Sequence, residues 1–364
     1  MENNDIQMLR LGFEEDEKEF YEASKIGINK KMRRFFSDAR KNAKQGTCFT
    51  CGKECSSFCK SHSVPKFCLK QVAVNGKVYF SGMQSEIPFM GDDSGIKEAG
   101  TFQLICRECD STLFQDYESP AAYNSRPTGK ILAEIAMKDY LQIISKRLQE
   151  RSLYLLTEEQ FPQNRNYARH QQEIIDLDLV EFTTAYQRAK AASSGKHNDW
   201  YYLCYYRQLD YVVPFAMQSR IVMICDFEGN VINDIYNMSP DYHTKEIHVA
   251  VFPLEKTSII LMFLDSREKR YRKFYRQLNK LELDDQLAAI NYIIHSYCEN
   301  VFLSKNISED ILKDKNFLDV SQKSSIVTSS LPFGNALQTA IMEFSLAKRN
   351  EIPNLLSTQN ALLN

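Results

Sequence analysis

Residues 48–67 read CFTCGKECSSFCKSHSVPKF, and this stretch decides the fold that we expect for the N-terminal part of the chain. It contains a Cys-x-x-Cys pair, Cys48 and Cys51, followed at once by a glycine that permits the positive φ of a tight knuckle turn. A second pair, Cys106 and Cys109, comes later in the chain. Four thiolates hold a structural zinc ion tetrahedrally, and the two-residue spacer lets both sulfurs of a pair reach one ion. The two pairs therefore predict one zinc site.

Three further side chains in the same stretch offer a competing set of ligands. Cys55, Cys59 and His62 are spaced i, i+4 and i+7, so that on a helix they would line one side. A second zinc ion, or a different combination of ligands, is therefore an open alternative. His62 itself has three interpretations: a zinc ligand, the general base of a nuclease, or a structural side chain. We expect Cys68 to pack in the core.

The composition is that of an ordinary globular protein. The 364 residues are 43% hydrophobic and 25% charged, which is typical of a chain that buries a core in two or three domains. No apolar run approaches the roughly 20 residues that span a membrane, and the acidic N-terminus lacks the apolar segment of a secretory signal. We therefore expect a cytoplasmic protein with no membrane partner, whose ten cysteines stay reduced.

We expect three regions and an α+β fold. Residues 1–46 predict a basic amphipathic helical segment, residues 47–120 the cysteine-rich module, and residues 121–364 a larger domain of unknown role. In the larger domain, segments rich in β-branched and aromatic residues predict a mainly antiparallel sheet, and helical periodicity flanks it. The predicted strands are WYYLCYYRQL, RIVMICDF, IHVAVFPL and TSIILMFL, with a hairpin turn at 228–230. The predicted helices span residues 131–150, 166–192, 266–302, 308–314 and 333–348.

The order of motifs in the cysteine-rich module resembles that of the HNH endonucleases of the His-Me finger superfamily, in their zinc-bearing, treble-clef branch. The resemblance rests on Cys-x-x-Cys-Gly, then SHSVPKF, then the strand TFQLIC that leads into the second pair and Asp110, and it covers about residues 47–120. It implies a zinc-stapled ββα-metal finger in which His62 is the general base. It also implies that Asp110 holds a catalytic Mg²⁺ or another divalent ion, with Glu118 as a further catalytic carboxylate. Lys66 would then touch a phosphate.

Two positions depart from the family pattern. The acidic residue that precedes the histidine in the family is Ser61 here, and the family's asparagine falls on Thr101. We expect Asp110, together with Glu118, to supply the charge that Ser61 lacks. The leading hypothesis is a metal-dependent endonuclease that hydrolyses phosphodiester bonds, a type of module associated with bacterial defence against phage. The alternative is a catalytically inactive zinc finger that binds nucleic acid or protein.

A net charge of −2 means that any nucleic-acid binding has to come from local patches. The basic helix predicted over residues 25–44 is one such patch, and it runs directly into the finger. Its candidate contacts are Lys30, Lys31, Arg33 and Arg34. Residues 267–280 form a second basic segment with interleaved aromatics. For both, the alternative is a solvated face above an apolar stripe. We expect DNA as the partner, and we leave open a protein partner or an oligomer through the C-terminal domain.

Overall fold

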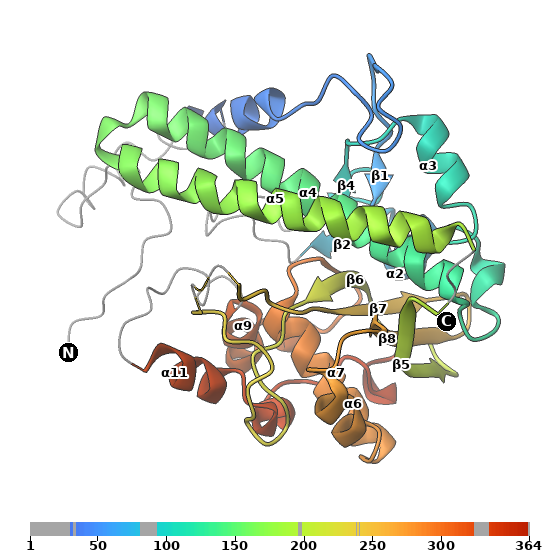
Figure 1. Cartoon of the computed structure of the whole chain (residues 1–364). Coiled ribbons are helices and arrows are strands. Elements are labelled where there is room, and N and C mark those ends of the chain that lie inside the picture. The colour runs from blue at the N-terminus through green and yellow to red at the C-terminus, as the bar shows by residue number, and fades with distance from the viewer. Residues whose placement is uncertain are drawn as a thin grey trace. The chain divides into compact units, whose positions relative to one another are not determined.

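A computed structural model describes residues 30–31, 34–80, 93–195, 199–237, 239, 241–323 and 335–362 (Figure 1). The chain divides into two compact units, each assembled from separate stretches of sequence. Unit 1 consists of Met1–Ser61, Phe102–Leu113 and Met137–Lys190, and unit 2 of His62–Thr101, Phe114–Ala136 and Ala191–Asn364. The start of the basic helix predicted over 25–44, and Arg33 within it, lie outside the described residues.

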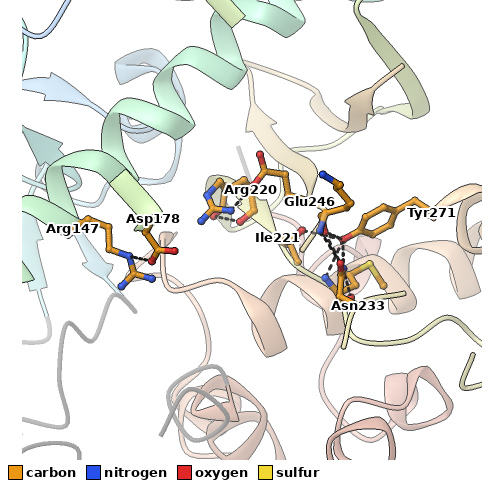
Figure 2. A network of polar contacts seen from close by, with 10 residues as sticks. Arg147, Asp178, Arg220, Ile221, Asn233, Glu246 and Tyr271 are labelled. Carbon is orange, nitrogen blue, oxygen red and sulfur yellow. Dashed lines mark hydrogen bonds and ion pairs between the residues drawn. The ribbon is translucent and has the colours of Figure 1, made fainter. Parts of the chain in front are cut away.

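Two long helices dominate unit 1. Helix α4 (Gly129–Gln160) enters this unit at Met137, and helix α5 (Arg165–Ser193) runs back beside it (Figure 1). Pro162 follows the end of α4 and opens a 3₁₀ turn, η3 (Pro162–Asn164), because proline disfavours helical geometry in the preceding residue. The helix predicted over residues 166–192 is confirmed, since α5 covers this range. Ion pairs join the two helices: the Arg147 guanidinium lies 2.9 Å from the Asp178 carboxylate (Figure 2).

A shorter helix over residues 34–42 lies in the same unit. Its apolar side chains Phe35 and Ala39 are buried, and the Phe35 ring meets Phe161 edge-on at 5.8 Å. Helix α3 (Arg107–Leu113) begins directly after Cys106 and contains Cys109, the last cysteine of the second pair. Within the described part of residues 25–44, the predicted amphipathic helix is confirmed, with an apolar stripe inward and basic residues outward.

Unit 2 is built on a seven-stranded antiparallel sheet with the strand order β3-β2-β9-β6-β7-β8-β5. The strands are β2 (Lys77–Phe80), β3 (Asp93–Gly95), β5 (Tyr201–Leu209), β6 (Phe215–Ile221), β7 (Ile247–Pro253), β8 (Ser258–Asp265) and β9 (Val301–Leu303). The predicted α+β class and antiparallel sheet are confirmed. The sheet takes β2 and β3 from sequence that we assigned to the finger. The strand predicted at 220–227 was misplaced, since β6 begins at Phe215.

Both faces of the sheet are covered, which explains why every residue of β7 is buried. Val249 and Val251 of β7 belong to the main apolar core together with helices α6 (Arg272–Leu278) and α7 (Leu283–Tyr297). On the alternate positions, Phe252 packs edge-on against Tyr123 at 5.2 Å. Helix α2 (Lys66–Val72) contacts β6, β7 and β9.

The helix predicted over residues 266–302 is confirmed in part. The chain forms two helices there, α6 and α7, which are separated by the turn at 279–282, and it ends in strand β9 where helix was expected. The remaining elements are β1 (Ser61–His62) paired with β4 (Thr101–Phe102), η2 (Pro120–Tyr123), α8 (Glu309–Leu312), α9 (Lys315–Ser321), α11 (Ala336–Glu343), η4 (Leu346–Asn350) and η5 (Thr358–Asn360). Among the described residues, no helix is long and apolar enough to cross a membrane.

A buried polar network holds the irregular segment that follows β6 in unit 2. The Asn233 amide nitrogen donates to the Met223 carbonyl at 2.8 Å and to the Lys245 carbonyl at 2.9 Å, while the Lys245 backbone N–H donates to the Asn233 side-chain oxygen at 2.7 Å. The Tyr271 hydroxyl lies beside Asn233 (Figure 2) and donates to the Lys245 carbonyl at 2.8 Å. One buried asparagine therefore satisfies three backbone groups of residues 223 and 245.

Candidate metal centre

The four cysteines predicted to share a zinc ion come together in unit 1. The sulfurs of Cys48, Cys51, Cys106 and Cys109 all lie within 4.8 Å of one another. Cys48 is buried and Cys51 is exposed, so that the cluster sits at the surface of the unit. Four sulfurs bound to one tetrahedral zinc ion at about 2.3 Å are separated by a little under 4 Å, which is close to the observed spread. The donor set thus fits zinc.

The backbone around these sulfurs has the form of a knuckle. Gly52 adopts a φ of 71° and donates its N–H to the Cys48 carbonyl at 2.8 Å, which confirms the expected use of this glycine. The Cys106 N–H donates to the Cys48 sulfur at 3.2 Å, and the Cys109 N–H donates to the Cys106 sulfur at 3.4 Å. Backbone donors aimed at sulfur favour the thiolate, which is the form that binds metal.

The electrostatics of the cluster also favour a bound cation. Burial alone would raise the pKa of the Cys48 thiol, but backbone N–H groups of Cys106, Cys51 and Thr50 overcome this effect and lower the pKa to about 6. Burial and the neighbouring sulfurs instead raise the pKa of Cys109 far above its usual value. Four crowded thiols cannot all ionise without a cation between them, because like charges repel. A divalent ion would supply that charge.

Helix α5 supports the first knuckle from within the same unit. The Tyr186 hydroxyl and the Thr50 hydroxyl are 2.6 Å apart, and the Tyr186 ring meets the Phe49 ring at 5.3 Å. The Lys190 ammonium donates to the Thr50 carbonyl at 2.9 Å. These contacts position Cys48 and Cys51 without using either sulfur.

The competing ligand set of Cys55, Cys59 and His62 is not assembled. The Cys55 thiol donates to the Lys53 carbonyl at 3.4 Å, and residues 55–59 are not helical. The Cys59 thiol donates to the Asp110 carboxylate at 3.3 Å. Cys68 is fully buried in α2, as expected of a packing residue.

Asp110, the predicted ligand of a catalytic ion, directly follows Cys109 of the four-cysteine cluster and is already surrounded by donors of unit 1. Its Oδ1 accepts from the Ser61 hydroxyl at 2.5 Å and from the Lys138 ammonium at 2.9 Å, and its Oδ2 accepts from Cys59. Burial would raise the pKa of Asp110, but the Lys138 charge and the Ser61 hydroxyl hold it below its usual value. The Ser61 hydroxyl and the Asp110 carboxylate are therefore direct neighbours. In this arrangement, however, Asp110 does not fit a divalent ion, because both of its oxygens are engaged.

His62 and Glu118, the other predicted catalytic residues, belong to unit 2. The His62 ring is half-buried, and its Nε2 lies 2.8 Å from the Ile96 carbonyl. A carbonyl oxygen only accepts, so Nε2 carries the hydrogen and the lone pair of the neutral ring is on Nδ1. Glu118 accepts from the Lys66 backbone N–H at 3.4 Å, at the start of α2.

The segment after His62 is fixed by packing in unit 2. The Ser63 hydroxyl donates to the Asn300 side chain at 3.0 Å, and the Ser63 N–H donates to the Gly100 carbonyl at 3.0 Å. Gly100 has a φ of +62°, and a Cβ there would lie 2.3 Å from the Phe302 ring. Thr101, at the family's asparagine position, donates through its hydroxyl to the Glu98 carbonyl at 3.0 Å.

The predicted nucleic-acid contacts are exposed where they are described. Lys30, Lys31 and Arg34 are exposed on unit 1, and Lys66 is exposed on unit 2. Lys138, whose side chain is fully buried, was not predicted as a site residue from the sequence. The signal was a lysine in the middle of the apolar run ILAEIAMKDYLQII, where a charge has to find a partner.

Comparison of the chain with protein-family models, with curated proteins and with solved structures gives no match. The fold and the site therefore define the class: an α+β protein with a four-cysteine cluster suited to zinc.

Proposed function

We propose that unit 1 is a nucleic-acid-binding module whose surface is held in shape by a structural zinc ion. The observation that carries this proposal is the excess of exposed cations over carboxylates in the stretch of sequence that leads into the first cysteine pair and contains it. In the described part of residues 30–61, eight cationic side chains are exposed, against the two carboxylates Asp38 and Glu54. The cations are Lys30, Lys31, Arg34, Arg40, Lys41, Lys44, Lys53 and Lys60.

Charge of this density suits a phosphate backbone. Each phosphate that a lysine or arginine neutralises releases condensed counterions, so binding tightens and depends on salt. Some of the charge is shared: Lys41 lies 3.5 Å from Asp38, and Lys53 lies 3.2 Å from Glu108. These are exposed pairs that a phosphate can replace at small cost, since surface ion pairs contribute little. The zinc ion would keep the knuckle bearing Lys53 folded.

The test measures binding of a fluorescently labelled DNA duplex by its fluorescence anisotropy at several salt concentrations. The triple variant Arg40→Gln, Lys41→Gln, Lys44→Gln removes three cations from unit 1. We expect the affinity at about 0.15 M salt to fall on the order of 100-fold, and the salt slope to drop by about 2.7.

The matched control removes three exposed lysines of unit 2: Lys256→Gln, Lys313→Gln, Lys315→Gln. It has the same net charge as the test variant. Equal loss of affinity in both triples would show that binding follows net charge and not this surface, and the proposal would be abandoned.

A second candidate function is hydrolysis of phosphodiester bonds, with His62 as the general base. It is favoured by the Ile96 carbonyl, which holds the ring in the tautomer that can accept a proton on Nδ1. It ranks second because the carboxylate of Asp110 is engaged by Lys138. The assay is nicking of supercoiled plasmid with Mg²⁺ or Mn²⁺. The enzymatic function would be established if the native chain and the exposed control His170→Ala nick the plasmid and His62→Ala does not. If the plasmid stays intact with the native chain and both variants, the enzymatic function would be rejected.

A further inference from the structure

Lys138 is a fully buried cation that neither the zinc cluster nor the nucleic-acid-binding surface requires. It lies in α4, within unit 1, and its side chain is 0% exposed. An ammonium group taken out of water without an opposite charge costs several kcal/mol, so its burial requires a specific partner. The Asp110 carboxylate, 2.9 Å away, is such a partner.

Three separate segments converge on that carboxylate. Ser61 reaches it from β1, Cys59 from the loop before β1, and Lys138 from α4. Asp110 itself follows the zinc cysteine Cys109 in α3. The hydroxyl, thiol and ammonium all act as donors and take three of the roughly four lone-pair positions of the carboxylate, so a metal ion would have to compete with hydrogen bonds for them. A hard divalent ion would need those same lone pairs.

We propose that the Lys138 ammonium is a built-in cation for Asp110, placed where a divalent ion would otherwise bind, and that it fastens α4 to the metal-binding helix α3. The proposal concerns contacts inside unit 1 alone and does not rest on nucleic-acid binding. It predicts that the native site rejects divalent ions, and that removal of the ammonium turns the same side chains into a site for one.

The test is binding of Mn²⁺ to the purified, zinc-loaded full chain, measured by the electron paramagnetic resonance of free Mn²⁺. Lys138→Met keeps an apolar stem of similar length and removes the charge. We expect no Mn²⁺ bound to the native protein beyond the level of Asp110→Asn, and one Mn²⁺ bound per chain of Lys138→Met. The double variant Lys138→Met, Asp110→Asn should return to none. Lys146→Met, elsewhere on α4, is the matched control and should behave as the native chain.

Two results obtained with folded proteins would overturn the proposal. One is a Mn²⁺ ion on the native chain that Asp110→Asn removes; the other is a folded, zinc-loaded Lys138→Met chain that binds none. If Lys138→Met does not fold, the double variant decides. Recovery of folding in Lys138→Met, Asp110→Asn supports the pairing of charges, whereas an equally unfolded double variant shows that Lys138 acts through packing and refutes it. Nucleic-acid binding enters none of these readouts, so its failure would be seen separately.

Discussion

His295 of α7 gives the sharpest prediction about stability, because its ring is buried and desolvation lowers its pKa. The side chain is 3% exposed and lies between the rings of Phe215, at 5.6 Å, and Phe317, at 4.7 Å. Its Nε2 has no hydrogen-bond partner among the described residues. Burial lowers the pKa of His295 from 6.5 to about 3, since the imidazolium would be desolvated.

The sign of the effect follows from proton linkage. The unfolded chain takes up a proton on His295 near pH 6.5, whereas the folded chain resists it down to about pH 3. Unfolding is therefore favoured as the pH falls through this window, and the effect is absent above it. From pH 7 to pH 5, His295 alone should lower the free energy of unfolding by about 2 kcal/mol.

The assay is urea unfolding at pH 7, 6 and 5, with the fluorescence of Trp200 as the readout. Trp200 is the one tryptophan of the chain and belongs to unit 2, as does His295. His295→Leu removes the titrating group and keeps an apolar side chain. We expect the native chain to lose about 2 kcal/mol more than His295→Leu between pH 7 and pH 5. The exposed His170→Leu should keep the native slope. Identical pH slopes for the native chain and His295→Leu would refute the reasoning.

Three further predictions concern the zinc site and unit 2. Cys106→Ser should abolish the one zinc ion per chain that elemental analysis is expected to find, whereas Cys55→Ser should retain it; zinc lost from both would contradict the ligand assignment. Gly100→Ala should cost roughly 2–5 kcal/mol in urea unfolding, because its Cβ meets Phe302 at 2.3 Å and its φ is +62°, while Gly46→Ala, which meets nothing within 4 Å, should cost much less. Asn233→Ala removes the side-chain partner of the Met223 carbonyl and of the Lys245 N–H, at roughly 1–3 kcal/mol for each, and a midpoint unchanged in urea would count against the network.

Local patterns in the sequence predicted those structural features that depend on residues close together along the chain. The two Cys-x-x-Cys pairs predicted a shared cluster because each pair is a short turn that presents two sulfurs. The cluster of four sulfurs then forms as soon as the two turns meet. Residues 166–192 predicted a helix because their periodicity is continuous. The start of β6 was missed because Phe215 follows Pro214 in an apolar run that carries no clear alternation.

Pairings between distant residues escaped prediction for a different reason. Strand β2 pairs with β9 through Tyr79 and Leu303, and nothing near either residue specifies the other. The ion pair of Asp110 with Lys138 is similar: the sequence shows a carboxylate after a cysteine and a lysine inside an apolar helix, but their meeting is a property of the tertiary fold. The candidate site was therefore predictable in its four clustered cysteines and not in the surroundings of Asp110.

The chain between the two cysteine pairs does not stay in the unit that holds them. It leaves unit 1 after Ser61, contributes β2 and β3 to the sheet of unit 2, and returns at Phe102. A zinc ion shared by the two pairs would close this excursion into a ring, and ring closure removes conformational entropy from the unfolded chain. By analogy with a disulfide that spans a similar length, the effect is on the order of 4 kcal/mol. Metal bound in one unit would thus favour assembly of the sheet edge in the other through the connectivity of the chain alone.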